Sequence, residues 1–248
     1  MDEVALHGSF ELVDPAEVRL AAGELHVWAV PLAGDAVELV SLLSPAEHDR
    51  AARFHFADHR RRYEISHGAL RLILGGYLGR DPAVLGFEAG HRGKPFLAGQ
   101  VSSGAGPFFN LSHSGKLALI GIAGTELGLD CEKVRHLTSY YQIAEKHFSE
   151  DEFRGLSALG ESDRLLAFYR CWTRKEAYIK ALGEGLSMAL DSFDVSLDDD
   201  ARLVACRNGN GEAGDWSMLD VSPGPEFVAA CALRGAPSRV RQFRLGVD

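Results

Sequence analysis

The amino-acid sequence predicts an α+β protein, and the arrangement of its segments favours that class over a doubly wound sheet. Strand-like and helix-like segments are mixed along the chain without regular strand–helix–strand alternation. Residues 61–78 and 163–182 have the periodicity of long helices, whereas short apolar segments lie between and after them. If the chain divides into two units, we expect the seam near residues 121–128.

The first third of the chain has one strand and two helical segments. Residues 23–32 alternate in polarity and predict a strand. Ser44 is a candidate N-cap because Pro45 follows it at the first helical position. The helix predicted over residues 61–78 ends where glycine and then proline follow it. Residues 90–107 are rich in glycine and proline, so we expect mostly loop there.

The middle of the chain predicts a hairpin and a third strand. The segments "FFNLSHSG" (residues 108–115) and "LALIGIAG" (residues 117–124) form the hairpin, which turns around Gly115 and Lys116. The segment "LGLDCEKV" (residues 127–134) follows as the third strand.

The last part of the chain begins with helices and ends with strands. Residues 139–159 have a helical pattern, and Ser149 with Glu152 fits a capping box. The helix over residues 163–182 is the clearest one, and Gly183 is its natural C-cap. Short strands of an antiparallel sheet are expected in the segments "FDVSL", "RLVAC", "WSMLDV" and "FVAACAL".

The composition narrows the class of function. The chain has 248 residues and a net charge of −9, which argues against binding to nucleic acid or acidic membranes. No apolar run is long enough to span a membrane, and the acidic start does not resemble a signal peptide. Its four widely spaced cysteines indicate reduced thiols, so we expect a cytoplasmic protein. Residues 48–63 hold five arginines and three histidines, which suits a small polyanionic ligand or a solvated helix face.

Two carboxylates stand two positions apart in the predicted strand over residues 127–134. Side chains alternate along a strand, so Leu127, Leu129 and Cys131 point to one side and Asp130 and Glu132 to the other. Adjacent carboxylates repel each other, and a hard cation such as Mg²⁺, or alternatively Mn²⁺, relieves the repulsion. The other interpretation is a pair of acids exposed to solvent.

The helix over residues 163–182 adds a third acid and a base. Trp172, Glu176 and Lys180 are four apart and share one face. A metal would serve Glu176 and a phosphate oxygen would serve Lys180, because charges on a largely apolar helix need partners. An exposed Glu–Lys pair is the alternative interpretation.

Two other patterns lack the context that their chemistry requires. Residues 208–214 match G-x-G-x-x-G, but a strand and not a helix follows them, which argues against a dinucleotide site. Ser112 and His113 are neighbours on a strand and point to opposite faces, so they do not form a hydrolase triad.

The segments "GKPFL", "FNLSHSG", "GLDCEKV" and "WTRKEAYIKALGEGL" occur in this order. Together they resemble the Sfp-type 4′-phosphopantetheinyl transferases, over about residues 44–196. The resemblance implies two similar α/β subdomains related by pseudo-twofold symmetry. We place the N-terminal subdomain, on the nucleotide side of coenzyme A, at residues 1–123. The C-terminal subdomain, with the metal carboxylates and the catalytic helix, then covers residues 124–248.

The resemblance also implies an activity. Members of this family transfer the 4′-phosphopantetheine arm of coenzyme A to a serine of an apo acyl or peptidyl carrier protein and release 3′,5′-ADP. The expected enzyme is a Mg²⁺-dependent transferase of the holo-[acyl-carrier-protein] synthase type, with coenzyme A as co-substrate. Which carrier it modifies, in fatty-acid, polyketide or nonribosomal peptide synthesis, stays open.

Particular residues match the family's functional positions. Asp130, Glu132 and Glu176 match the metal ligands, and Lys180, with Lys175 as a further candidate, would supply positive charge to the pyrophosphate. The catalytic candidates are Asp130, Glu176 and Lys180, with Glu176 or a water on the metal as the base. The positions that match coenzyme A contacts are Arg50, Arg62, Arg92, Gly93, Lys94, Pro95, Ser112, His113 and Lys180.

Two positions depart from the family pattern. Glu47 stands where some relatives have a lysine, so recognition of the 3′-phosphate is expected to rest on Arg50, Arg53 and Arg62. Cys131 replaces an aliphatic residue, which is conservative if it packs in a core.

The carrier is expected to dock through local apolar contacts from residues 99–108 and 137–147, since the enzyme is itself acidic. We expect a monomer. Two other classes stay open: a coenzyme A-binding protein without catalysis, and another Mg²⁺-dependent phosphotransferase such as a nucleotide pyrophosphohydrolase.

Overall fold

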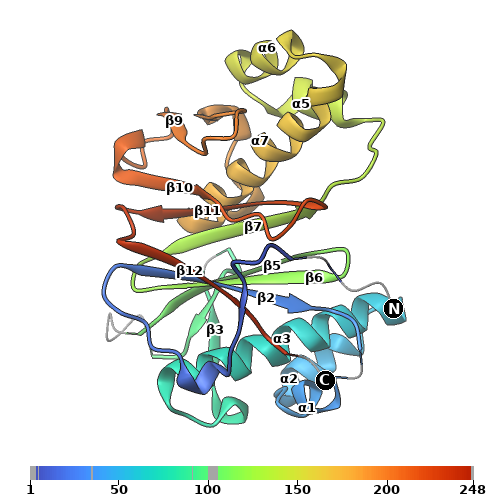
Figure 1. The fold of residues 1–248 in the computed structure, drawn as a ribbon, viewed down its shortest axis with the longest axis vertical. Coiled ribbons are helices and arrows are strands. Elements are labelled where there is room, and N and C mark those ends of the chain that lie inside the picture. The colour runs from blue at the N-terminus through green and yellow to red at the C-terminus, as the bar shows by residue number, and fades with distance from the viewer. Residues whose placement is uncertain (1–3, 5, 35, 91, 100–105, 247–248) are drawn as a thin grey trace.

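The computed structural model describes residues 4, 6–34, 36–90, 92–99 and 106–246, and it shows an α+β protein, as the sequence predicts. Two sheets lie face to face and long helices cover their outer sides, which gives the layer order helix, sheet, sheet, helix (Figure 1). The first sheet has the strand order β1 (Glu11–Leu12), β12 (Arg239–Arg244), β2 (Glu24–Pro31), β6 (Leu117–Ala123) and β5 (Phe108–Ser114). The second sheet has the order β10 (Trp216–Asp220), β11 (Phe227–Arg234) and β7 (Leu127–Lys133).

Helices lie outside each sheet. The first sheet is covered by α3 (Ala57–Leu78), beside which lie the short helices α1 (Val37–Ser41) and α2 (Pro45–Ala51). The second sheet is covered by α7 (Glu161–Leu182), with α5 (Tyr140–His147) and α6 (Glu150–Ala158) beyond it. Two small antiparallel pairs complete the strands of the described residues: β3 (Phe87–Ala89) with β4 (Pro95–Leu97), and β8 (Phe193–Val195) with β9 (Leu203–Cys206). Single 3₁₀ turns connect the elements at Pro15–Glu17, Pro82–Val84, Gly185–Ser187, Leu190–Ser192 and Ala213–Asp215.

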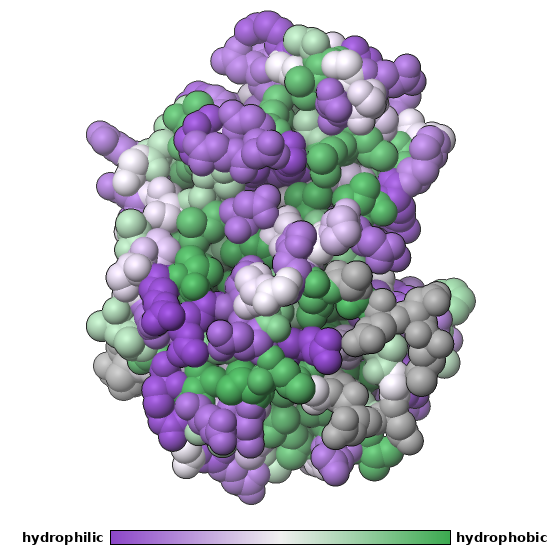
Figure 2. Space-filling model, viewed as in Figure 1, coloured by the Kyte–Doolittle hydropathy of each residue, from purple (hydrophilic) through white to green (hydrophobic). Residues whose placement is uncertain are grey.

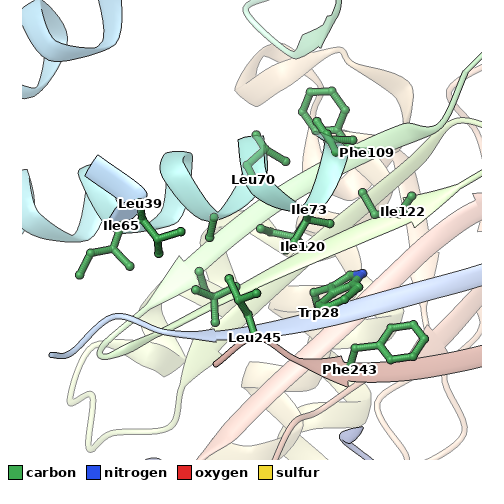
Figure 3. Packing of buried hydrophobic residues seen from close by; sticks show 14 of the residues in the cluster. Trp28, Leu39, Ile65, Leu70, Ile73, Phe109, Ile120, Ile122, Phe243 and Leu245 are labelled. Atoms are coloured by element: carbon green, nitrogen blue, oxygen red, sulfur yellow. The ribbon is translucent and has the colours of Figure 1, made fainter. Parts of the chain in front are cut away.

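Three apolar cores hold these layers together. In the first, Ile65, Leu70 and Ile73 of α3 point onto the sheet residues Ile120 and Ile122 (Figure 3). A second core lies between the two sheets, and a third lies between the second sheet and α7. Burial of apolar surface is the main stabilising term in such layers, so the three cores fix how the two halves stack.

The surface is mixed in character. On the face drawn in Figure 2, apolar residues appear in several groups separated by hydrophilic ones. Within the part of the chain that the structure describes, no helix combines the length and apolar character needed to cross a membrane.

The long helices α3 and α7 are built alike. Each has 22 residues and ends at a glycine in the left-handed conformation, Gly79 (φ 59°) or Gly183 (φ 71°). Glycine suits this C-cap because it has no Cβ to clash there. The short helix that precedes each long one, α2 or α6, starts with a capping box.

The glutamate of each capping box pairs with a buried cation on the long helix. Glu47 of α2 contacts Arg71 at 2.7 Å, and Glu152 of α6 contacts Lys175 at 2.8 Å. Each cation also donates to backbone carbonyls of the segment after its helix, Arg71 to Leu85 and Lys175 to Phe193 among them. The same construction therefore occurs in both halves, as the resemblance implies.

Most predicted elements are confirmed, and two expectations are wrong. The segment 90–107 is mostly loop among its described residues, as expected, and contains the three-residue strand β4; residues 91 and 100–105 lie outside the described residues. The helical pattern over 139–159 is two helices, because extended backbone at Phe148 and Ser149 ends α5 and caps α6. The C-terminal strands do not form one sheet, since β8 pairs with β9 while β10 and β11 join β7.

The strand β12 was not predicted from the sequence. Three of its six residues are arginines, at 239, 241 and 244. The strand pairs in parallel with β2 of the first sheet. The two sheets separate between β6 and β7, beside the expected boundary at 123/124, but β12 returns from the second half to the first sheet.

Candidate active site

The site lies where β5 of the first sheet runs beside β7 of the second. Side chains of β5 bond to the backbone of β7: the N–H of Leu129 donates to Asn110 Oδ1 at 2.8 Å, and that of Cys131 to Ser112 Oγ at 3.3 Å. These bonds satisfy backbone donors that a sheet edge would leave unpaired. They also fix the two strands relative to each other.

The predicted alternation along β7 is confirmed. Leu127, Leu129 and Cys131 are buried in the core between the sheets, which leaves Asp130 and Glu132 on the opposite side, toward α7. Burial in that core raises the pKa of the Cys131 thiol, so this residue packs as a small apolar group.

The helix α7 lies directly against β7 because a glycine allows it. A Cβ placed on Gly128 would stand 2.0 Å from the carbonyl oxygen of Ala177 and 2.1 Å from the N–H nitrogen of Ala181. This close approach sets Glu176 and Lys180 of α7 opposite the carboxylates of β7.

Asp130, Lys180 and Ser112 form a compact polar group. The Lys180 ammonium donates to Asp130 Oδ1 at 2.6 Å, to Ser112 Oγ at 3.1 Å and to the carbonyl of Leu129 at 3.2 Å. The Ser112 hydroxyl donates to the same Asp130 oxygen at 2.9 Å. The group therefore joins β5, β7 and α7.

The three predicted carboxylates affect each other. Burial raises the pKa of Glu176, and the charges of Asp130 and Glu132 raise it further. Burial also raises the pKa of Glu132, although its carboxylate accepts a hydrogen bond of 2.7 Å from Ser114 Oγ. Negative charge thus gathers here at an energetic cost that one ammonium, on Lys180, offsets only in part.

Two oxygens of this group are buried and have no hydrogen-bond partner among the described residues. They are Asp130 Oδ2 and Glu176 Oε1. Buried polar atoms are normally paired, so two orphaned carboxylate oxygens in one acidic group need an explanation. Still, the described residues contain no set of three or more acidic, histidine or cysteine side chains already spaced to hold a metal ion.

Two of the residues expected to contact the nucleotide are neighbours on β5. Partial burial lowers the pKa of His113, and the charges of Arg62 and Lys180 lower it further. Ser112 and His113 point to opposite faces of β5, as expected from the alternation. The guanidinium of Arg50 lies over the ring of Tyr63.

The hairpin of β3 and β4 joins the two halves beside the site. The Lys94 ammonium donates to the carbonyls of Leu127 (2.9 Å) and Ala181 (3.0 Å), at the ends of β7 and α7. Arg92 bonds to Ser187 Oγ after α7. Gly93 has a φ of 85° in the turn before β4, which starts at Pro95. The roles of these residues toward a ligand stay predictions.

Lys175 does not belong to the site, and this expectation is wrong. Its side chain is fully buried in the core of the second half, where it contacts Glu152 and the carbonyls of Leu190 and Phe193. It lies five positions before Lys180 on α7, so it points away from the side of the helix that carries Glu176 and Lys180. Similarly, Glu47 is committed to Ser44 and Arg71.

Sequence reasoning missed several residues near the site. Asn110 and Ser114 were within the quoted "FNLSHSG" segment, and their two-residue spacing from Ser112 was the available signal. A cavity of about 150 Å³ beside Glu132 was also missed; it is lined by Arg135, Leu137, Ile143 and Trp172, among others.

The structure shows an α+β protein of two similar halves, with a buried acidic group and a lysine where the halves meet. Comparison with known proteins identifies the family. Residues 27–125 match the family model described as 4′-phosphopantetheinyl transferase, N-terminal, and residues 126–232 match the 4′-phosphopantetheinyl transferase superfamily. The chain belongs to the 4′-phosphopantetheinyl transferase superfamily.

Individual relatives agree with this. The chain is 36% identical over 230 residues to 4′-phosphopantetheinyl transferase HetI of Nostoc sp., covering 90% of this chain and 93% of that protein. It is 31% identical over 171 residues to a Bacillus subtilis 4′-phosphopantetheinyl transferase (69% and 74% covered). It is 29% identical over 193 residues to 4′-phosphopantetheinyl transferase Sfp of Bacillus subtilis strain 168 (78% and 83% covered).

Proposed function

We propose that this transferase moves the 4′-phosphopantetheine arm of coenzyme A to a serine of an apo carrier protein, with Mg²⁺ as cofactor. The observation that carries the proposal is the group formed by Asp130, Glu176 and Lys180. It combines an ion pair with two buried carboxylate oxygens that no described residue bonds to.

The donor set fits a hard divalent cation. All the candidate ligand atoms are carboxylate oxygens, which select Mg²⁺ or Mn²⁺ over Zn²⁺. Burial and then mutual repulsion raise the pKa of Glu132 and Glu176. A cation held by these two residues and Asp130 would satisfy the orphaned oxygens and relieve that repulsion. When bound, it would neutralise charge on the diphosphate of coenzyme A. Within the described part of the chain no three side chains are already spaced to hold an ion, so these carboxylates would have to move closer together around it.

The residues of the chain would supply binding, orientation and proton transfer. The carrier serine oxygen forms a bond to the β-phosphorus, and the bond from that phosphorus to the bridging oxygen breaks. The bridging oxygen leaves with the electron pair as part of 3′,5′-ADP. Lys180, whose side chain is 29% exposed, is placed to stabilise this developing negative charge. Glu176 is the proposed acceptor of the serine proton, either directly or through an intervening water.

The cations on α2 and α3 would hold the nucleotide end. Arg50 and Arg62 have no ion pair with a described residue, so their guanidiniums are available to a phosphate. Ser112 of β5 accepts a bond from Lys180, and the next residue, His113, is influenced by the charges of both Arg62 and Lys180. Arg92, Gly93, Lys94 and Pro95 would line the site from the β3–β4 hairpin, although Lys94 already uses two of its three donors on carbonyls.

The protein substrate is proposed to approach beside Glu132. The cavity there includes Leu137 and Ile143 from the region expected to dock the carrier. The other expected docking segment lies largely outside the described residues. A monomeric state, a cytoplasmic location and the identity of the carrier stay predictions.

Intact-mass analysis of several apo carrier proteins, incubated with enzyme, coenzyme A and Mg²⁺, tests the proposal. Transfer adds the phosphate-bearing arm, so the modified carrier gains roughly 340 Da, and 3′,5′-ADP appears only when carrier is present. A coenzyme A-binding protein without catalysis would leave every carrier unchanged. A pyrophosphohydrolase would release nucleotide without any carrier.

A further inference from the structure

Three side chains of α2 and α3 form a stack that the chemistry at Asp130 does not use. The guanidinium carbon of Arg50 lies 5.6 Å from the centre of the Tyr63 ring. The Tyr63 ring in turn stacks on the His67 imidazole, with 3.9 Å between ring centres and 30° between ring planes. Tyr63 is 6% exposed, so its ring is fixed by packing, whereas Arg50 is exposed.

The stack holds Arg50 without consuming its hydrogen-bond donors. Two arginines of α3 are committed to carboxylates, Arg60 to Glu64 at 2.8 Å and Arg71 to Glu47 at 2.7 Å. Arg50, like Arg62, has no ion pair among the described residues, but it is oriented by the face of an aromatic ring. A cation–π contact orients a guanidinium while its N–H groups stay free for a second, anionic partner.

A hydrogen bond within α3 fixes the other end of the stack. His67 is held by a 3.0 Å bond between its Nδ1 and the carbonyl of Tyr63. Burial lowers the pKa of His67, and Glu47 and Arg50 of α2 and His113 of β5 also influence it.

Glu47 does not cancel the charge of Arg50. Burial alone would raise the pKa of Glu47, but bonds from Ser44 and Arg71 outweigh it and hold the pKa below its ordinary value. The carboxylate is thus ionised but already neutralised by Arg71. The charge left beside Arg50 is therefore positive, which suits a phosphate dianion.

We propose that Tyr63, supported by His67, is a positioning residue that presents Arg50 to the 3′-phosphate of coenzyme A. The inference rests on the proposed function, in which coenzyme A is the donor. The stack then contributes to the preference of the enzyme for coenzyme A over 3′-dephospho-coenzyme A, which lacks that phosphate.

The test compares steady-state KM and kcat for the two donors. For Tyr63→Leu, KM for coenzyme A should rise about tenfold, the order expected for one lost cation–π contact, while kcat stays near wild type. The KM for the dephospho donor should not change, so the preference of the enzyme falls by the same factor. Tyr63→Phe keeps the ring and should keep the wild-type ratio of the two KM values. Phe56→Leu, at an aromatic residue outside the stack that is 68% exposed, is the matched control.

Arg50→Gln and the double variant Arg50→Gln/Tyr63→Leu complete the design. If Tyr63 acts through Arg50, the double variant should lose no more preference than Arg50→Gln alone. Equal rises in both KM values for Tyr63→Leu, or a wild-type ratio in that folded variant, would overturn the inference and leave the proposed function standing. A wild-type enzyme that transfers no arm from coenzyme A would instead overturn the proposed function. Thermal unfolding of each variant establishes that it is folded.

Discussion

The ammonium nitrogen of Lys180 lies 2.6 Å from Oδ1 of Asp130, and this ion pair joins the last turn of α7 to the middle of β7. The Asp130 side chain is 6% exposed and that of Lys180 is 29% exposed. The pair is therefore anchored on its acidic side and open to a ligand on its basic side. A second lysine of the same helix, Lys175, is fully buried against Glu152.

This contrast predicts different effects for two similar substitutions. Lys180→Met removes positive charge that faces the diphosphate, so kcat should fall by about 100-fold or more. The melting temperature should fall as well, but less than for Lys175→Met, because Lys180 is partly exposed and Asp130 keeps its bond from Ser112. Lys175→Met leaves Glu152 buried and unpaired, so the free energy of unfolding should fall by about 3–5 kcal/mol. Turnover assays and urea unfolding of both variants check this. A Lys175→Met protein of normal stability and low kcat would contradict the structure.

The sequence alone predicted the parts of the site that depend on local periodicity. Strand alternation placed Asp130 and Glu132 on one face, and helical spacing placed Glu176 and Lys180 together on another element. Periodicity does not say which faces meet. That Gly128 allows the two elements to touch follows from a tertiary contact and is visible only in the structure.

Long-range pairing explains what the sequence did not predict. β12 is rich in arginine and pairs with β2, which lies more than 200 residues earlier in the chain. No local sequence pattern therefore indicates that it belongs to the first sheet. The sequence offers Lys175 as a further candidate cation beside Lys180, and this expectation is wrong. Its partner, Glu152, belongs to a different helix, and only the packing of α6 on α7 brings the two together.

Gly128→Ala tests the contact between β7 and α7. The added Cβ would meet the backbone of α7 at about 2 Å, at Ala177 and Ala181, and backbone cannot move aside as a flexible side chain does. We expect a loss of about 1–3 kcal/mol in unfolding free energy together with a large fall in kcat, because Lys180 and Glu176 move with the helix.

Gly124→Ala is the matched control for this substitution. Gly124 lies four residues earlier in the chain, and a Cβ there meets nothing within 4 Å. That variant should keep wild-type stability and activity. If both variants behave alike, the close approach of α7 to β7 does not position the site.

Glu176→Gln should separate stability from activity. A raised carboxyl pKa means that the folded state favours the protonated group; this contribution to stability is present below the ordinary pKa of 4.5 and is lost as pH rises through the raised value. At pH 7.5 without divalent metal, the charged Glu176 therefore costs free energy, and the glutamine variant should melt at a higher temperature than wild type.

Metal addition is the second part of the Glu176 experiment. Mg²⁺ that binds only the folded protein should raise the melting temperature of the wild type in proportion to occupancy. The Glu176→Gln variant should respond much less and should have almost no transferase activity. An equal response of both proteins to Mg²⁺ would remove Glu176 from the metal site.

The pH dependence of stability should report on His67. Burial lowers the pKa of His67 from 6.5 to about 4, which outweighs the bond to the Tyr63 carbonyl. A histidine with a lowered pKa stabilises the fold above pH 6.5, and that contribution is lost as pH falls toward 4, at up to about 1.4 kcal/mol per pH unit. His67→Phe keeps a ring beside Tyr63 but cannot titrate, so its stability should fall less steeply between pH 6.5 and 4.5.

Chemical denaturation of both proteins across this pH range measures the difference in slope. His26 is also buried with a lowered pKa, but it is present in both proteins and does not contribute to the difference. Identical slopes would show that His67 is protonated at no cost in the folded state. Because His67 is uncharged at neutral pH, it supports Tyr63 by stacking and not by attracting phosphate. The same His67→Phe variant should therefore keep the wild-type preference for coenzyme A over its dephospho form.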